Sequence, residues 1–173
     1  MTRVCLELLV YVWGLFVYRG SNVEPHKMEK LSIAIQTEAN ELIIRPSVQF
    51  VRTLLGQLSP FADNERLLYS AELIFNEALV NIVEHTYQAT NTGSLRIIVK
   101  IADERLTFRF EDWGQSFDPD SVPPPDLETP PEGGMGLWFI RQFVDELHYR
   151  TEPDGKNVLE LTKQIPGLRV KLD

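Results

Sequence analysis

The chain has 173 residues, of which 43% are hydrophobic and 24% charged, and its formal net charge is −8. This length and composition predict one globular domain with a substantial core, rather than two domains. The negative charge argues against a nucleic-acid partner, because phosphate contacts need clustered lysine and arginine. The single cysteine, Cys5, excludes an internal disulfide and a cysteine metal cluster, and we expect a cytoplasmic protein.

Residues 1–27 are expected to be a disordered leader, followed by one folded domain at residues 28–173. Residues 4–18 form an apolar run of about 15 residues, shorter than the roughly 20 that a membrane-spanning helix needs. The run resembles the apolar stretch of a signal peptide, but Gly20-Ser21-Asn22 is a poor cleavage site. A disordered tail, or a true start of translation at Met28, is favoured over membrane attachment.

The next elements in chain order are two extended segments and a helix. Residues 31–35 alternate apolar and polar side chains, which is typical of a strand, and residues 40–44 form a second extended segment. Pro46 suits the first turn of a helix. From there the apolar residues of 47–58 fall on one helical face, and Ser59-Pro60 ends it.

A longer helix and a hairpin follow. Asp63 or Asn64 can cap this helix, and its apolar periodicity predicts that it extends to about Tyr87. Residues 94–101 and 105–111 then predict two antiparallel strands joined by a short turn.

The last third begins with a long loop, residues 114–134, which holds six prolines and little apolar periodicity. A loop of this length inside a compact domain is more often functional than idle. Residues 135–146 resume helical spacing, and residues 147–151 and 158–163 predict two final strands. This order of elements predicts an α+β sandwich, with helices on one face of a mostly antiparallel sheet.

Glu77 and Asn81 lie four residues apart on the longer helix and therefore share a face. Their neighbours are apolar, and polar side chains in such surroundings are costly unless something polar meets them. One interpretation is a magnesium site, in which Asn81 offers a hard oxygen ligand and Glu77 accepts a proton from a hydroxyl nucleophile. The alternative is that both lie on the wet side of an amphipathic helix. His85, four residues further on, has at most a supporting role.

Two further signals follow on other elements. Asp112 comes just after a predicted strand, beside Gly114, and its carboxylate can accept the amino group of adenine. The alternative is a common Asp-x-Gly turn. The glycines of residues 133–136 precede a helix, where backbone N–H groups can surround phosphate oxygens. They form neither a P-loop nor a dinucleotide-binding fingerprint.

Together, the three signals resemble the motifs of the GHKL ATPase superfamily. Residues 77–87 (EALVNIVEHTY) resemble its N box, residues 111–119 (EDWGQSFDP) its first glycine box, and residues 134–146 (GMGLWFIRQFVDE) its second. The E-A-x-x-N-x-x-x-H-x-Y form and the closing V-D-E are most similar to the anti-sigma factor serine/threonine kinases. The resemblance covers about residues 31–163.

The resemblance implies a Bergerat ATP-binding fold, with the proline-rich loop as an ATP lid. It implies ATP and Mg²⁺ as cofactors, Glu77 as the catalytic base and Asn81 as the metal ligand. The residues that it implies for nucleotide binding are Asn81, His85, Asp112, Gly114, Gly134, Met135, Gly136 and Leu137.

The resemblance also implies a homodimeric anti-sigma factor that binds a sigma factor and phosphorylates a STAS-domain antagonist. The alternative is a non-catalytic, nucleotide-gated binding module that sequesters a partner. Ser116 makes the alternative credible, because it replaces the second glycine of the family's first glycine box. A sensor histidine kinase is disfavoured, since His26 is followed by a strand rather than by a dimerising helix.

Overall fold

The computed structural model describes residues 10–12, 15–19, 30–86, 93–116, 119–125, 135–168 and 170. The strands are β1 (Val10–Val12), β2 (Leu15–Arg19), β3 (Lys30–Glu38), β4 (Ser94–Ala102), β5 (Arg105–Asp112), β6 (Glu146–Thr151) and β7 (Asn157–Gln164). The helices are α1 (Ile44–Leu55), α2 (Glu65–Asn81) and α3 (Gly136–Phe143).

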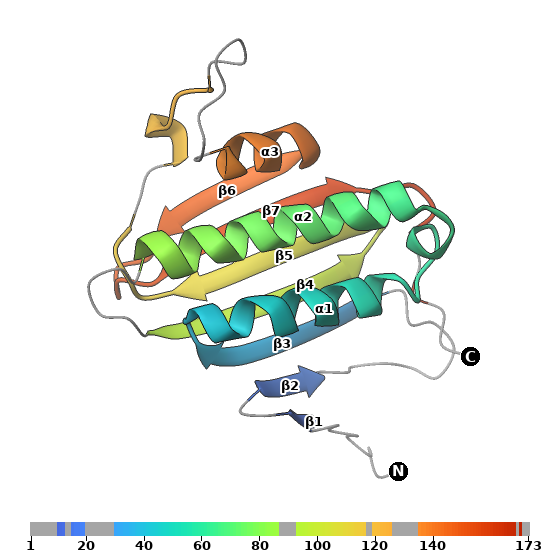
Figure 1. The fold of residues 1–173 in the computed structure, drawn as a ribbon, viewed down its shortest axis with the longest axis horizontal. Helices are drawn as coiled ribbons and strands as arrows, with labels where there is room; N and C mark the ends of the chain where they lie inside the picture. Colours follow the sequence, from blue (N-terminus) through green and yellow to red (C-terminus); the bar gives the residue numbers. More distant parts are fainter. Residues whose placement is uncertain are drawn as a thin grey trace.

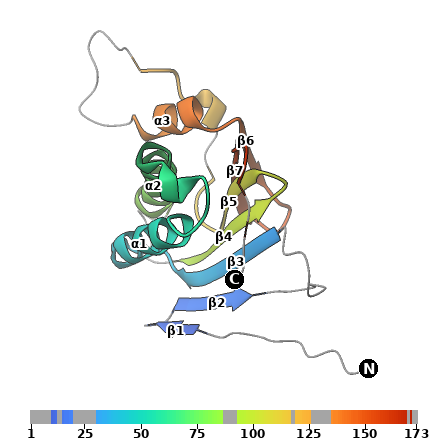
Figure 2. The same cartoon turned by 90° about the vertical axis from the view of Figure 1, so that its right-hand side faces the viewer.

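All seven strands form one antiparallel sheet, in the order β1-β2-β3-β4-β5-β7-β6. The three helices lie on one face of this sheet (Figure 1). The edge-on view shows the two layers, helices on one side and strands on the other (Figure 2). The predicted α+β sandwich is therefore confirmed.

The core fills the space between these layers. Ile35, Ile97 and Phe110 lie opposite one another on β3, β4 and β5, and all three are fully buried. Phe75 of α2 packs on the rings of Phe108 and Phe110, with ring centroids 5.2 and 5.4 Å apart. Because side chains alternate across a strand, every second residue of these strands faces the helices.

The long helix begins where its cap predicts. Asn64 accepts a hydrogen bond from the Leu67 backbone N–H at 3.0 Å, which satisfies one of the free donors of the first turn. Its buried residues recur every three or four positions, so one face of α2 lies on the sheet. After α2 the chain continues as a π-helical turn, Ile82–Thr86.

Three predicted boundaries were wrong. The helix predicted to end at Ser59-Pro60 is α1, which ends at Leu55. Residues 40–44 are not extended: Asn40 Oδ1 accepts the Leu42 N–H at 3.0 Å, which starts a 3₁₀ turn that leads directly into α1. The helix predicted to reach residue 146 ends at Phe143, because Val144 is extended and Glu146 already pairs with β7.

The N-terminal segment adds strands to the sheet. β2 pairs with β3, with Val17 opposite Ile35, and β1 pairs with β2. Residues 10–12 and 15–19 are strands, whereas the division into a leader at residues 1–27 and a folded domain at residues 28–173 stays a prediction. Within the described part of the chain, no helix is long and apolar enough to cross a membrane.

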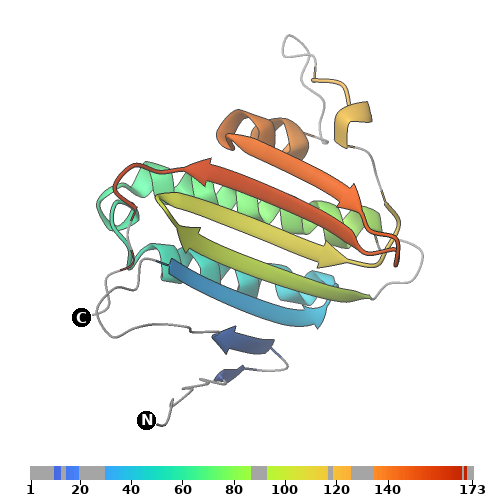
Figure 3. The same cartoon turned by 180° about the vertical axis from the view of Figure 1, so that it is seen from behind.

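The opposite face of the sheet is not covered by any described helix (Figure 3). It carries ion pairs, such as Arg109 with Glu111 of the same strand at 2.6 Å and Arg109 with Glu160 of the neighbouring β7 at 3.4 Å. Asp112, one residue after Glu111, points to the helix side, where Leu95 lies opposite it in the core. The predicted site residues therefore belong to the helix-covered face.

Candidate active site

Three predicted site elements meet at one end of the molecule. The C-terminal part of α2, the end of β5 and the start of α3 all lie in the left half of Figure 1 and the right half of Figure 3. These elements carry Glu77 and Asn81, Asp112, and Gly136, respectively. Residues far apart in the sequence thus share this end of the fold.

Gly136 lies directly against the Glu77 carboxylate. A Cβ atom placed on Gly136 would be 2.5 Å from Glu77 Oε2 and 3.5 Å from Glu77 Cβ, closer to the oxygen than real contacts allow. The φ of Gly136 is not positive, so its backbone conformation does not require glycine. Glycine is required here for space, because any side chain would displace the carboxylate of Glu77.

The first turn of α3 has backbone N–H groups without a partner inside the helix. Met135, half-buried, is its N-cap residue and makes no side-chain capping hydrogen bond. The first intrahelical bond runs from Phe139 N to Met135 O at 3.0 Å, so the preceding N–H groups of the first turn have no acceptor within the helix. Such groups attract anions, and phosphate oxygens above all.

Asn81 ends α2 one turn after Glu77, and both side chains are half-buried. The helix changes there to a π-helical turn, an irregularity that is frequent at functional sites. No cluster of three or more His, Cys, Asp or Glu side chains occurs among the described residues. Asn81 offers an amide oxygen, a hard ligand of the kind that Mg²⁺ takes together with phosphate and water oxygens.

Asp112 is held rigidly at the end of β5. Its side chain is 3% exposed, and its Oδ1 accepts hydrogen bonds from Gly114 N and Asn157 Nδ2, both at 2.9 Å. Burial raises the pKa of Asp112, and these two hydrogen bonds oppose that rise. Asn157 was not predicted as a site residue, although it lies directly opposite Asp112 on β7.

Ser116 and Trp113 flank the same turn without straining it. Ser116 is exposed and does not have a positive φ, so its backbone conformation needs no glycine. Trp113 has 45% of its surface exposed. The departure from the family's glycine box is therefore compatible with the backbone found here.

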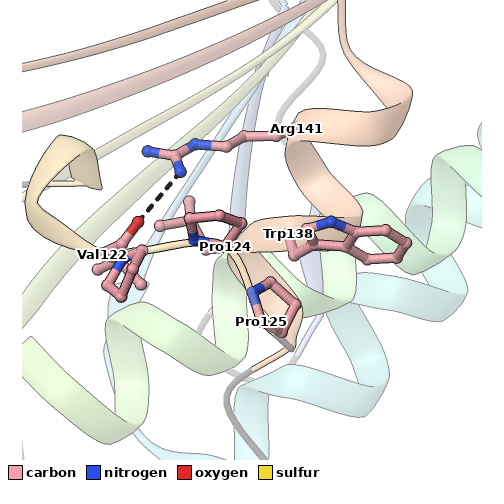
Figure 4. Close-up of a pocket in the computed structure, with 7 residues that line it drawn as sticks. Val122, Pro124, Pro125, Trp138 and Arg141 are labelled. Carbon is pink, nitrogen blue, oxygen red and sulfur yellow. Dashed lines mark hydrogen bonds between the residues drawn. The ribbon is translucent and has the colours of Figure 1, made fainter. Parts of the chain in front are cut away.

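Leu137 lines a groove of about 200 Å³ between α3 and the proline-rich segment (Figure 4). Arg141 reaches from α3 across this groove and donates hydrogen bonds to Pro119 O at 2.6 Å and to Val122 O at 3.3 Å. Its role was not predicted. The groove is lined by Val122, Pro123, Pro124, Pro125, Leu137, Trp138 and Arg141.

The structure thus brings together two pairs, Glu77 with Gly136 and Asp112 with Gly114. The side chain of His85 and the whole of Gly134 lie outside the described residues. That these pairs bind one nucleotide between them stays a prediction.

Most of this chain is similar in sequence to known proteins. Residues 47–163 match the family described as the histidine kinase-like ATPase domain. Similar relatives include the proteins named serine-protein kinase RsbW of Bacillus cereus (strain B4264), Bacillus thuringiensis subsp. konkukian (strain 97-27) and Bacillus mycoides (strain KBAB4). Each is 30% identical over 156 residues, which cover 85% of this chain and 92% of the relative.

The matched range begins within α1, ends within β7 and includes every described site residue. Membership of an ATPase family implies the use of ATP. The chain belongs to the histidine kinase-like ATPase domain family and, within it, to the RsbW-like anti-sigma factor kinases of the GHKL superfamily.

Proposed function

We propose that this chain is a homodimeric serine/threonine protein kinase and anti-sigma factor, which binds a sigma factor and phosphorylates a STAS-domain antagonist. The observation that carries this proposal is the contact between Glu77 and Gly136, where a carboxylate lies against the start of a helix whose N-cap residue makes no side-chain capping hydrogen bond. Relatives named as serine-protein kinases support the reaction class. The family resemblance supplies the two partners.

Glu77 is the base of the proposed reaction. The acceptor hydroxyl oxygen bonds to the γ-phosphorus of ATP, the bond from that phosphorus to the bridging oxygen breaks, and ADP leaves with the electron pair. The hydroxyl proton passes to the Glu77 carboxylate. Glu77 meets the phosphates at the N-terminus of α3 because Gly136 has no side chain to separate the two.

The surrounding groups position the reactants. The N–H groups at the start of α3, which have no acceptor within the helix, would hold phosphate oxygens, and the Asn81 amide oxygen would hold the metal. A bound Mg²⁺ ion supplies charge neutralisation on the phosphates. The carboxylate of Asp112 accepts a hydrogen bond from the amino group of adenine at the other end of the nucleotide.

Glu77→Gln tests the proposal, because it keeps the size of the side chain and removes its capacity to accept a proton. Purified wild-type and variant chains are incubated with Mg²⁺, γ-labelled ATP and each STAS-domain protein of the same organism. We expect one of these proteins to be labelled by the wild type. The variant should label it at least about 100-fold more slowly, with ATP binding retained.

Equal labelling rates would remove Glu77 from the role of base. If the wild type binds a STAS-domain partner in an ATP-dependent way but transfers no label, the chain is a nucleotide-gated sequestering module instead.

A further inference from the structure

Three polar side chains form a row across neighbouring strands at the end of the sheet. Asp112 on β5 lies opposite Asn157 on β7, and Asn157 lies opposite Thr151 on β6. Asp112 and Asn157 are 3% and 1% exposed, on the face that the helices cover. Polar side chains that are buried to this extent are costly unless hydrogen bonds satisfy them.

The hydrogen bonds of the row fix the orientation of the Asn157 amide. Its Nδ2 donates to Asp112 Oδ1 at 2.9 Å and to Gly114 O at 3.1 Å, and its Oδ1 accepts the Thr151 hydroxyl at 2.9 Å. A flipped amide would place an oxygen against two acceptors, because a carboxylate and a carbonyl donate nothing. Only one orientation therefore satisfies all three partners.

This orientation also fixes the two oxygens of Asp112. Oδ1 accepts from both Asn157 Nδ2 and Gly114 N, so rotation of the carboxylate would break two hydrogen bonds at once. Within the described part of the chain, no group donates to Oδ2. Oδ2 is left as the acceptor for a ligand, and the side chain that holds it in this state is Asn157.

We propose that Asn157 is a specificity-determining positioning residue, which holds Asp112 so that the site selects 6-amino purines over 6-oxo purines. The inference rests on the proposed use of ATP. Adenine offers an N–H donor at its 6-position to a carboxylate oxygen, whereas hypoxanthine and guanine offer an acceptor there. Without the Asn157 amide, the Asp112 carboxylate can turn away or take up a proton, and its preference for a donor weakens.

The test compares binding of Mg-ATP and Mg-ITP, which differ at the 6-position of the purine, by calorimetry. The variants are Asn157→Leu, which removes the amide at similar size, and Thr151→Val, which removes only the hydrogen bond to Asn157 Oδ1. We expect the wild type to prefer ATP by at least about 100-fold. Asn157→Leu should weaken ATP binding by about 10- to 100-fold and leave ITP binding nearly unchanged.

Thr151→Val should lower the ATP-to-ITP preference by a smaller factor, about 3- to 10-fold. Gly167→Ala is the control, because Gly167 lies in the turn beyond the far end of β7 and should alter stability alone. If ATP and ITP weaken in parallel in Asn157→Leu, its role is structural only and the proposal is overturned. If Asn157→Leu does not fold, an unchanged preference in Thr151→Val overturns it.

A wild type that binds no ATP refutes the proposed function along with this inference. A wild type that binds ATP with a preference insensitive to both substitutions refutes only the role of Asn157.

Discussion

Gly136→Ala perturbs the proposed base without changing it chemically. The added Cβ would lie 2.5 Å from Glu77 Oε2, whereas ordinary contacts begin at 3.4 Å, so the carboxylate must retreat by about 0.9 Å. The cost in stability is small, because the obstructing atom is the end of a flexible side chain. Alanine is also favoured over glycine in a helix by up to about 1 kcal/mol.

A displacement of this size at a reacting group lowers the rate by about 100-fold. We therefore expect the free energy of unfolding of Gly136→Ala to lie within about 1 kcal/mol of the wild-type value. The rate of phosphoryl transfer to the STAS-domain protein should fall by about 100-fold. Urea unfolding gives the first quantity and initial labelling rates give the second. ATP affinity should change less than the rate.

Gly167→Ala is the matched control. Gly167 has a φ of +82° with open space around its Cβ position, so alanine strains the backbone and meets no atom. This substitution should cost about 1–2 kcal/mol of stability and leave the rate unchanged. The reasoning would be refuted by a folded Gly136→Ala chain that transfers phosphate within about threefold of the wild-type rate.

Three further predictions concern buried polar groups. Asp112→Asn should abolish ATP binding, because its Oδ1 still meets the two donors and its N–H₂ then faces the purine amino group. Burial raises the pKa of Asp112, so its carboxyl group binds a proton more tightly in the folded wild type than in the unfolded chain. Its stability should therefore fall as the pH rises from the ordinary aspartate pKa to the raised one. Urea unfolding across acidic pH should show no such fall for the nucleotide-free variant, and an equal fall would contradict the assignment. Ser47→Ala should raise the free energy of unfolding by about 1 kcal/mol, because Ser47 Oγ is buried without a hydrogen-bond partner among the described residues. A lower urea midpoint would show that the hydroxyl stabilises the fold.

The elements that could be predicted are those whose signals are local. The cap at Asn64 and the apolar spacing after it specify α2, and the antiparallel pair β4 and β5 follows from its alternating residues. The same local reasoning placed Glu77 and Asn81 on one helix face and Asp112 at a strand end. Local reasoning failed at residues 40–44, which were predicted to be extended but where the Asn40 side chain caps a helical turn.

The contacts that sequence reasoning missed are long-range. Asn157 meets Asp112 across 45 residues, and Arg141 meets Pro119 across 22, so neither pairing is visible in the order of the chain. Gly136 was predicted as a phosphate glycine. Only the packing of α3 against α2 reveals that Glu77 also requires this glycine.

The two ends of the candidate site are held in place by different interactions. Asp112 belongs to a hydrogen-bonded row on the sheet, whereas Glu77 and Gly136 depend on how one short helix lies on another. At the proposed adenine site, a competitive inhibitor that mimics the adenine ring would meet a surface that is already ordered, and would lose little affinity to reorganisation. An inhibitor that mimics the phosphates would depend on the placement of α3, so the purine end is the better starting point for a selective compound.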